Sequence, residues 1–330
     1  MAFSSIVQQR IEGWDAASQE FGPLLRGEAG SWERTRAHYL QALAIHPTPA
    51  GVTVEDIDMG AIPGTVVTPE VVEEGRVLLY FHGGGYVAGS PAGYHGLAGH
   101  YARLLKAKVF MPDYRLAPQH PFPAAIDDSL ASYEWLLAQG YPAHRIAFSG
   151  DSAGGALVVS VMARARNKGL PLPVAGVALS PWVNLEHTGS SLRTRDGIDP
   201  TVSHAGLELL AKAFLGNALK NDPDASPVFA DVRGLPPILI HIGEREVMLS
   251  DAMRLAVHLA ENRVRVQLDV WPGMFHVWHM FAAELPEGMR ALEDAAYFLG
   301  RQWRTMDTAD GAASPSGATT RSAAPPARPA

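Results

Sequence analysis

Residues 145–155, RIAFSGDSAGG, decide the fold. The first part of this stretch, 146–149, is short and mostly apolar, which is typical of a buried strand. Gly150, Ser152 and Gly154 then fit the pattern G-x-S-x-G, and an apolar helical pattern follows. A serine on a sharp strand-to-helix turn has strained backbone angles, and glycines two residues to either side leave room for it. This order of elements predicts a nucleophile elbow with Ser152 as the nucleophile.

Short motifs recur by chance, so the pentapeptide alone also fits an ordinary glycine-rich turn before a helix. Other apolar segments favour the elbow, because each is followed by a motif that contains Gly, Pro or His. Strands are expected at 77–81, 108–111, 146–149, 174–179, 237–242 and 264–270. Helical patterns alternate with them, which predicts an α/β fold with a mostly parallel sheet. The carboxyl ends of such strands meet at one edge, where ligands bind.

Composition excludes several classes of protein. Of the 330 residues, 47% are hydrophobic and 18% are charged, which is typical of a globular chain. The formal net charge is −7 and no block of Lys or Arg occurs, so we expect no nucleic-acid partner. The absence of cysteine excludes disulfides, thiolate catalysis and Cys-ligated metals. No apolar run approaches the ~18 residues of a membrane span and no signal-peptide pattern is present, so we expect a cytoplasmic protein.

The sequence pattern divides the chain into segments. Residues 1–45 have amphipathic helical periodicity and are expected to form part of a cap, while 46–305 are expected to form the catalytic α/β domain. Within that domain, 183–235 interrupt the strand–helix alternation, so we expect an insertion that completes the cap. Residues 306–330 are rich in Ala, Pro, Ser, Thr and Gly without periodicity, and are predicted to be a disordered tail.

A nucleophilic serine needs a base, an acid that orients the base, and donors for an oxyanion. His276 is the predicted base because it follows the last expected strand, whereas His279 lies where a helix is expected and should pack in the core. Glu246, just beyond the preceding strand, is the preferred acid. Asp251 stays open as the alternative, although its place at the start of a helix also suits a capping role. The order serine, acid, histidine is the one that accompanies a nucleophile elbow.

Donors for the oxyanion are expected from two backbone segments. Residues 82–85, HGGG, follow a buried strand, and a loop without side chains lets N–H groups approach a substrate oxygen. A flexible turn is the weaker alternative, because consecutive glycines lose much entropy on folding without any packing in return. The N–H of Ala153 is the second donor. Tyr86, Trp182 and Phe214 are predicted to line the pocket, although aromatic side chains more often pack in the core.

Several acidic residues are expected to have structural roles. Asp113 and Arg115 are predicted to form an ion pair that braces the HGGG loop. At least one of Asp127 and Asp128, on an expected helix, is predicted to be merely solvated. Asp151, beside the nucleophile, is expected to help hold the elbow.

From about residue 77 to 298 the chain resembles the hormone-sensitive-lipase-like branch of the α/β-hydrolases, a family of bacterial carboxylesterases. The motifs that carry the resemblance are HGGGY (82–86), DYRLAP (113–118), HPFPA (120–124), GDSAGG (150–155), SPW (180–182), GEREVMLSD (243–251) and GMFH (273–276). The resemblance implies an eight-stranded, mostly parallel sheet, a helical cap, no cofactor or metal, and hydrolysis of short-acyl esters. It also implies that Ser152 is the nucleophile, that His276 is the base, and that the oxyanion hole is Gly84, Gly85 and Ala153.

Two positions depart from the family's pattern. Many members have Asp where this chain has Glu246, which keeps the assignment of the acid open. Many members also have Glu where this chain has Gln119, a difference that concerns only the bracing of a loop. The segment GEREVMLSD is similar to that of members described as monoterpene lactone hydrolases, so a cyclic ester is an alternative substrate.

Two further alternatives concern the kind of activity. An amidase or arylformamidase would use the same residues, whereas a non-catalytic small-molecule receptor on this fold would have lost the base that His276 supplies here. We therefore expect a small-molecule ester as the partner of this chain, and the sequence leaves a homodimer open.

Overall fold

The computed structural model describes residues 3–313, and an eight-stranded sheet forms its centre. The strands are β1 (Val52–Met59), β2 (Ile62–Pro69), β3 (Val77–Phe81), β4 (Lys108–Pro112), β5 (Ile146–Asp151), β6 (Gly176–Leu179), β7 (Ile238–Gly243) and β8 (Val266–Trp271). Their order in the sheet is β1-β2-β4-β3-β5-β6-β7-β8. The strand β2 is antiparallel to both of its neighbours, and all other pairs are parallel. The predicted α/β-hydrolase sheet is thus confirmed.

The central strands are apolar on both faces because helices cover both. Every residue of β3, β5 and β7 is buried, whereas the edge strand β1 is mostly exposed and β8 is only partly buried. Continuous apolar runs are the expected pattern for parallel strands covered in this way. The hydrophobic core therefore lies on both sides of the sheet, and the polar motifs are displaced to its carboxyl edge.

Five helices pack on the sheet: α4 (His95–Leu105), α5 (Ala124–Ala138), α6 (Ala153–Asn167), α9 (Leu249–Glu261) and α10 (Pro286–Ala313). Strand crossovers are right-handed, so the direction in which a connection crosses the sheet decides the face of its helix. The connection from β3 to β4 runs opposite to those from β4 to β5, β5 to β6 and β7 to β8. Hence α4 lies on one face and α5, α6 and α9 on the other. The helix α10 contacts α4 and shares its face.

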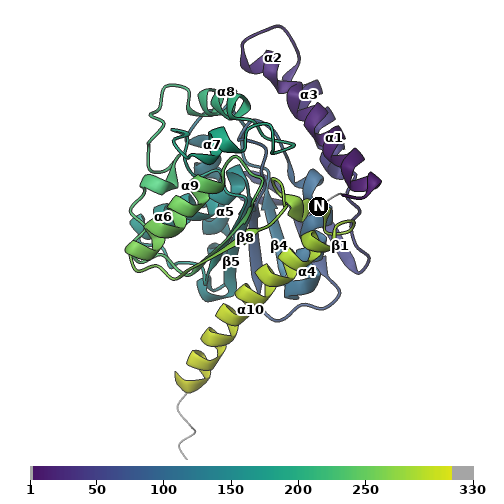
Figure 1. Ribbon diagram of the computed structural model, residues 1–330. Helices are drawn as coiled ribbons and strands as arrows, with labels where there is room; N and C mark the ends of the chain where they lie inside the picture. Colours follow the sequence, from purple (N-terminus) through teal and green to yellow (C-terminus); the bar gives the residue numbers. More distant parts are fainter. Residues whose placement is uncertain (1–2, 314–330) are drawn as a thin grey trace, which may run out of the picture.

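The remaining helices gather beyond the carboxyl edge of the sheet (Figure 1). They are α1 (Ser5–Gln19), α2 (Phe21–Leu25), α3 (Trp32–Ala44), α7 (Ser191–Thr194) and α8 (His204–Leu215). Hydroxyl groups of Ser4, Ser31 and Ser203 accept hydrogen bonds from the first turns of α1, α3 and α8, as favourable N-caps do. Because α2 contacts α8, the N-terminal segment and the insertion meet there. Short 3-10 helices are η1 (Pro91–Tyr94), η2 (Ala143–Arg145), η3 (Pro227–Phe229) and η4 (Trp278–Phe281).

The helix α10 ends at Ala313, past residue 306, where the sequence analysis placed the start of the tail. The first proline of the tail is residue 315, so no proline ends the helix before Ala313. The rest of the predicted tail, 314–330, lies outside the described residues. None of the helices in the described part of the chain is long and apolar enough to cross a membrane.

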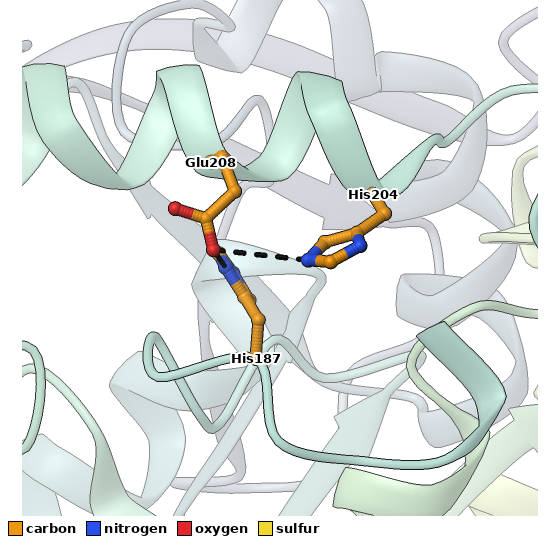
Figure 2. Close-up of side chains that lie close together, drawn as sticks. All are labelled: His187, His204 and Glu208. Atoms are coloured by element: carbon orange, nitrogen blue, oxygen red, sulfur yellow. Dashed lines mark hydrogen bonds and ion pairs between the residues drawn. The ribbon is translucent and has the colours of Figure 1, made fainter. Parts of the chain in front are cut away.

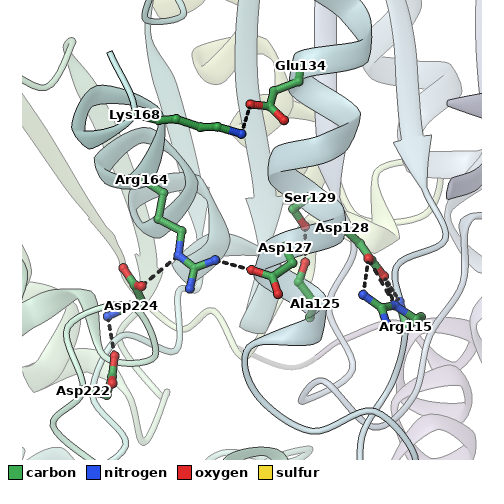
Figure 3. Close-up of polar contacts among 10 residues, drawn as sticks. All are labelled: Arg115, Ala125, Asp127, Asp128, Ser129, Glu134, Arg164, Lys168, Asp222 and Asp224. Carbon is green, nitrogen blue, oxygen red and sulfur yellow. Dashed lines mark hydrogen bonds and ion pairs between the residues drawn. The ribbon is translucent and has the colours of Figure 1, made fainter. Parts of the chain in front are cut away.

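The loop after β4 is fixed by an ion pair that differs from the predicted one (Figure 3). The backbone N–H of Arg115 donates to Asp128 Oδ2 at 2.9 Å, and its Nη2 donates to Asp128 Oδ1 at 2.7 Å. Asp128 is only 3% exposed, and it provides the two oxygens that a guanidinium fork prefers. Asp127 pairs with Arg164 of α6. The predicted pair of Asp113 with Arg115 is thus wrong, and neither Asp127 nor Asp128 is merely solvated.

We predict that Asp128→Asn lowers the free energy of unfolding by about 2 kcal/mol, because a buried carboxylate loses its charge beside a guanidinium and a backbone N–H. The control is Asp127→Asn, one residue earlier, where the side chain is 50% exposed and the change should stay below about 1 kcal/mol. Urea unfolding measures both values. Equal losses for the two variants would contradict the structural role of Asp128.

Candidate active site

Ser152 lies at the turn between β5 and α6 in a strained backbone conformation, with φ 53° and ψ −117°. The turn is held by backbone hydrogen bonds to the end of β6. The N–H of Ser152 donates to the carbonyl of Leu179 at 2.9 Å, and its carbonyl accepts from the N–H of Trp182 at 2.9 Å. These two bonds, to the end of β6 and to the loop after it, hold Ser152 in a strained conformation that an unrestrained turn would not keep.

The glycines of the motif are required by close backbone contact. A Cβ on Gly150 would overlap the carbonyl of Gly154, and a Cβ on Gly154 would overlap the carbonyl of Phe81 at the end of β3. Neither obstacle is a flexible side chain that could move aside. The G-x-S-x-G pattern therefore reflects the tight fit of the elbow against the end of β3.

A histidine and a carboxylate meet next to the elbow. His276 Nδ1 lies 2.9 Å from Glu246 Oε2, and Glu246 is fully buried. The other carboxylate oxygen, Oε1, accepts from the N–H of Gly243 at 2.6 Å and from the hydroxyl of Ser180 at 2.8 Å. The same hydroxyl accepts from the N–H of Val277 at 3.1 Å. The Ser180 hydroxyl thus connects Glu246 to the loop that carries His276, and these bonds fix the orientation of the carboxylate and of the imidazole.

The pKa of His276 lies above its usual value of 6.5. Burial alone would lower it, but the hydrogen bond to Glu246 and the charge of that carboxylate outweigh burial, and Asp199 and Asp151 add to the effect. These surroundings therefore make the imidazole of His276 a stronger base than a free histidine side chain.

The alternative acid, Asp251, is used elsewhere. It lies in the first turn of α9 and accepts from Asn184 Nδ2 at 2.9 Å and from Arg254 Nη1 at 3.0 Å. These bonds tie the start of the insertion to α9. Of the two candidates, Glu246 is the one that contacts His276.

Asp151 joins the elbow to the HGGG loop. Its Oδ1 accepts from the hydroxyl of Tyr80 at 2.7 Å and from the N–H of Gly83 at 3.0 Å, and its Oδ2 accepts from the hydroxyl of Tyr94 at 3.1 Å. Burial raises the pKa of Asp151 to about 6, although these hydrogen bonds oppose the rise. The expected role of Asp151 in holding the elbow therefore extends to the neighbouring loop.

The predicted oxyanion donors lie beside Ser152. Gly84 and Gly85 have φ of 110° and 60°, a region that favours glycine, and a Cβ on Gly84 would overlap the carbonyl of Ala88. Ala153 is the first residue of α6, and the first N–H groups of a helix have no partner within it. Gly84 and Gly85 thus line the same cavity as Ser152, and Ala153 follows Ser152 at the start of α6.

A cavity of about 250 Å³ opens above these groups. At the sheet edge it is lined by Gly84, Gly85, Ser152, Trp182 and His276. The N-terminal helices contribute mainly apolar residues, among them Trp14, Phe21 and Leu25, and α8 contributes Leu207, Leu209 and Leu210. The described side chains of Ser152 and His276 share this wall but form no hydrogen bond with each other, and such bonds commonly tighten only when substrate is bound.

The predicted pocket aromatics are divided between cavity and core. Trp182 lines the cavity, whereas Tyr86 and Phe214 are not among its lining residues and are each 1% exposed. Their rings stack at 3.7 Å, and the hydroxyl of Tyr86 donates to the carbonyl of Ala153 at 3.1 Å. The two stacked rings therefore pack in the core, and the hydrogen bond from Tyr86 to Ala153 supports the elbow at the start of α6.

Three residues near the site were missed by the sequence analysis. Trp14 of α1 stacks on the His276 ring with centroids 6.4 Å apart. Asp199 of the insertion is buried, which raises its pKa to about 6, and it accepts from the N–H of Val247 at 3.3 Å. Ser180 belongs to the SPW motif, so its place after a strand could be predicted from the sequence, but its hydrogen bonds could not. Trp14 and Asp199 had no signal beyond their place in the predicted cap.

Comparisons with known proteins identify the family of this chain. A family model for the alpha/beta hydrolase fold matches residues 78–280. An acetyl-hydrolase from Streptomyces hygroscopicus is 41% identical over 251 residues, which are 73% of this chain and 84% of that protein. An esterase from Acinetobacter venetianus is 31% identical over 78% of this chain and 85% of its own length.

Among solved structures, an esterase from the bacterial hormone-sensitive lipase family superposes with a TM-score of 0.84 and 38% identity. The match covers 92% of this chain and 100% of that one. The chain therefore belongs to the hormone-sensitive-lipase-like family of α/β-hydrolases. It is an enzyme, an ester hydrolase of the carboxylesterase kind.

We predict that Gly154→Ala destabilises the fold by about 3 kcal/mol or more, because its new methyl group would have to displace the backbone of β3. The matched control is Gly13→Ala in α1, where a Cβ meets nothing within 4 Å, and the helix should gain up to about 1 kcal/mol. Thermal and urea unfolding measure both variants. A Gly154→Ala protein as stable as the wild type would show that the elbow is less tightly packed than described.

Proposed function

We propose that this enzyme hydrolyses short-acyl carboxylic esters through a Ser152–His276–Glu246 triad and an acyl-enzyme. The observation that carries the proposal is the 2.9 Å contact between His276 Nδ1 and the fully buried Glu246. His276 and Ser152 line the same cavity. A hydrogen-bonded carboxylate fixes the tautomer of the imidazole, so its other nitrogen can accept the serine proton.

The proposed reaction has two steps. In the first, His276 Nε2 takes the proton of Ser152 as Oγ attacks the ester carbonyl carbon, and the N–H groups of Gly84, Gly85 and Ala153 stabilise the oxyanion. The C–O bond to the alcohol then breaks, and the alcohol leaves with the proton held by His276. In the second, His276 takes a proton from water, hydroxide attacks the acyl carbon, and Ser152 is released with that proton.

The size and polarity of the cavity favour a small acyl group. At about 250 Å³ it is smaller than the roughly 300–1,000 Å³ of pockets that hold drug-sized ligands, and its outer walls are largely apolar. The relative from Streptomyces hygroscopicus is an acetyl-hydrolase, which supports the same substrate class. We propose that the N-terminal segment, 1–45, and the insertion, 183–235, act as the cap that gives the cavity these walls.

The proposed function is tested with p-nitrophenyl acetate, butyrate and octanoate, together with a lactone and an anilide, and with Ser152→Ala as the blank. We expect the acetate and butyrate esters to be turned over fastest, and activity to disappear in the variant. Preference for the lactone or the anilide would assign a different substrate class to the same site. Tight ligand binding without turnover would favour a receptor, although a receptor would not need the pair of His276 and Glu246.

For the acid, we predict that Glu246→Gln lowers kcat by roughly 10³- to 10⁴-fold, because the tautomer and charge of His276 are no longer controlled. Asp251→Asn should retain most of the activity, because Asp251 contacts other partners. Steady-state hydrolysis of the butyrate ester measures both. The reverse pattern would reassign the acid to Asp251.

The same variants give a signed pH prediction. In the wild type, kcat/KM should rise with pH through the raised pKa of His276, so its acid limb lies above pH 6.5. Loss of the Glu246 charge removes the main cause of the raised pKa, so the limb of Glu246→Gln should move to lower pH. An unmoved limb would mean that another group controls His276.

A further inference from the structure

Outside the proposed triad, a second cluster of titratable side chains joins the loop after β6 to α8 (Figure 2). His204 and Glu208 lie one turn apart on α8, and His187 approaches them from the loop below. One ligand atom from each lies within 4.8 Å of the others. Two histidines and a carboxylate form a donor set that can hold zinc, so the protonation of these groups decides what the cluster does.

The protonation state follows from Trp182. Its indole Nε1–H donates to His187 Nε2 at 3.1 Å, with the two rings within 5° of parallel. An indole nitrogen can only donate, so Nε2 carries a lone pair and the proton of the neutral ring is on Nδ1. That N–H donates to Glu208 Oε1 at 2.6 Å, and Glu208 Oε2 accepts from Lys220 at 2.6 Å. The nitrogen that faces the cluster is therefore a donor, which disfavours a metal ligand and favours a hydrogen-bonded relay.

The relay links two walls of the catalytic cavity. Trp182 lines it at the sheet edge, and its backbone N–H holds the carbonyl of Ser152. Leu207 and Leu210 line it from α8, on the same helix as Glu208. The His187 side chain is only 1% exposed, so water cannot readily replace the bonds that it makes.

We infer that His187 is a positioning residue that fixes the cavity wall at Trp182 to α8, and that its protonation releases this wall and changes acyl-chain selectivity. The inference rests on the proposed function, because selectivity is read through ester hydrolysis. A protonated His187 donates from both nitrogens, so it can no longer accept from the indole, while its bond to Glu208 persists.

The groups that face His187 set the direction of the effect. Glu208 and His204 come from α8, Lys220 from the loop after it, and Trp182 from the loop after β6. Burial lowers the pKa of His187 below its usual 6.5; Glu208 opposes this, and Lys220 and His204 add to it. The His187 ring is therefore neutral near neutral pH, and the hydrogen bonds from Trp182 through His187 to Glu208 are intact. As the pH falls, the ring becomes protonated and the bond from Trp182 is lost.

The experiment compares kcat/KM for p-nitrophenyl butyrate with that for the acetate ester. Protonation of His276 affects both substrates alike, so the ratio isolates changes in the cavity wall. We expect the ratio to fall about fivefold between about pH 8 and about pH 5, the factor that one net hydrogen bond is worth, because the longer acyl chain loses a fixed wall. A ratio that does not change with pH would overturn the inference.

Variants and a second readout make the test specific. In His187→Gln the ratio should be independent of pH, whereas the matched control His204→Gln, in the same cluster but without a bond to Trp182, should retain the wild-type change. Independently of any activity, the 15N-labelled indole signal of Trp182, assigned with Trp182→Phe, should titrate in the wild type and not in His187→Gln. If hydrolysis itself fails, this signal still tests the relay, and an indole that does not titrate would overturn it.

Zinc provides the opposing outcome. With Nδ1 protonated, Zn²⁺ added at equimolar concentration near pH 7 should bind no more tightly to the wild type than to His187→Gln, as measured by calorimetry. Stoichiometric zinc binding that His187→Gln abolishes would show that the cluster is a metal site and would overturn the relay.

Discussion

The structure depends on one close fit: the turn after β5 is packed against the ends of β3 and β6 with no side chain between the backbones. Gly150 and Gly154 permit this contact, and the bonds of Ser152 to Leu179 and Trp182 maintain it. A strained residue persists only where its surroundings over-determine it. Ser152 therefore lines the cavity at the start of α6, where the dipole and the first N–H groups favour negative charge.

Two buried carboxylates organise what surrounds that serine. Glu246 orients the imidazole of His276 and is itself held by Ser180, whereas Asp151 fastens the HGGG loop to the elbow. Each acid accepts several hydrogen bonds, which compensate for the cost of burying it. His276 and the HGGG loop are thus fixed by separate networks, so a change in one network need not disturb the other.

The fold and the centre of the site could be predicted because their signals are local. Apolar runs indicate the buried strands, and the glycines at position 154 and in the HGGG loop indicate where the surrounding backbone leaves no room for a side chain. Features that depend on packing between distant segments had no such signal. Trp14 reaches His276 only because α1 folds over the edge, and the hydroxyl of Tyr86 finds the Ala153 carbonyl behind the elbow. The partner of Arg115 was wrong for the same reason, since Asp128 comes from another element.

The central claim is that Ser152 is a nucleophile activated by His276 within one site. The most direct measurement is mass spectrometry of the protein after reaction with an alkyl phosphonate ester that carries a p-nitrophenol leaving group. We predict a single adduct on Ser152, formed at a rate that rises with pH through the pKa of His276 and nearly abolished in His276→Ala. Modification at another residue, or an undiminished rate in that variant, would contradict the account.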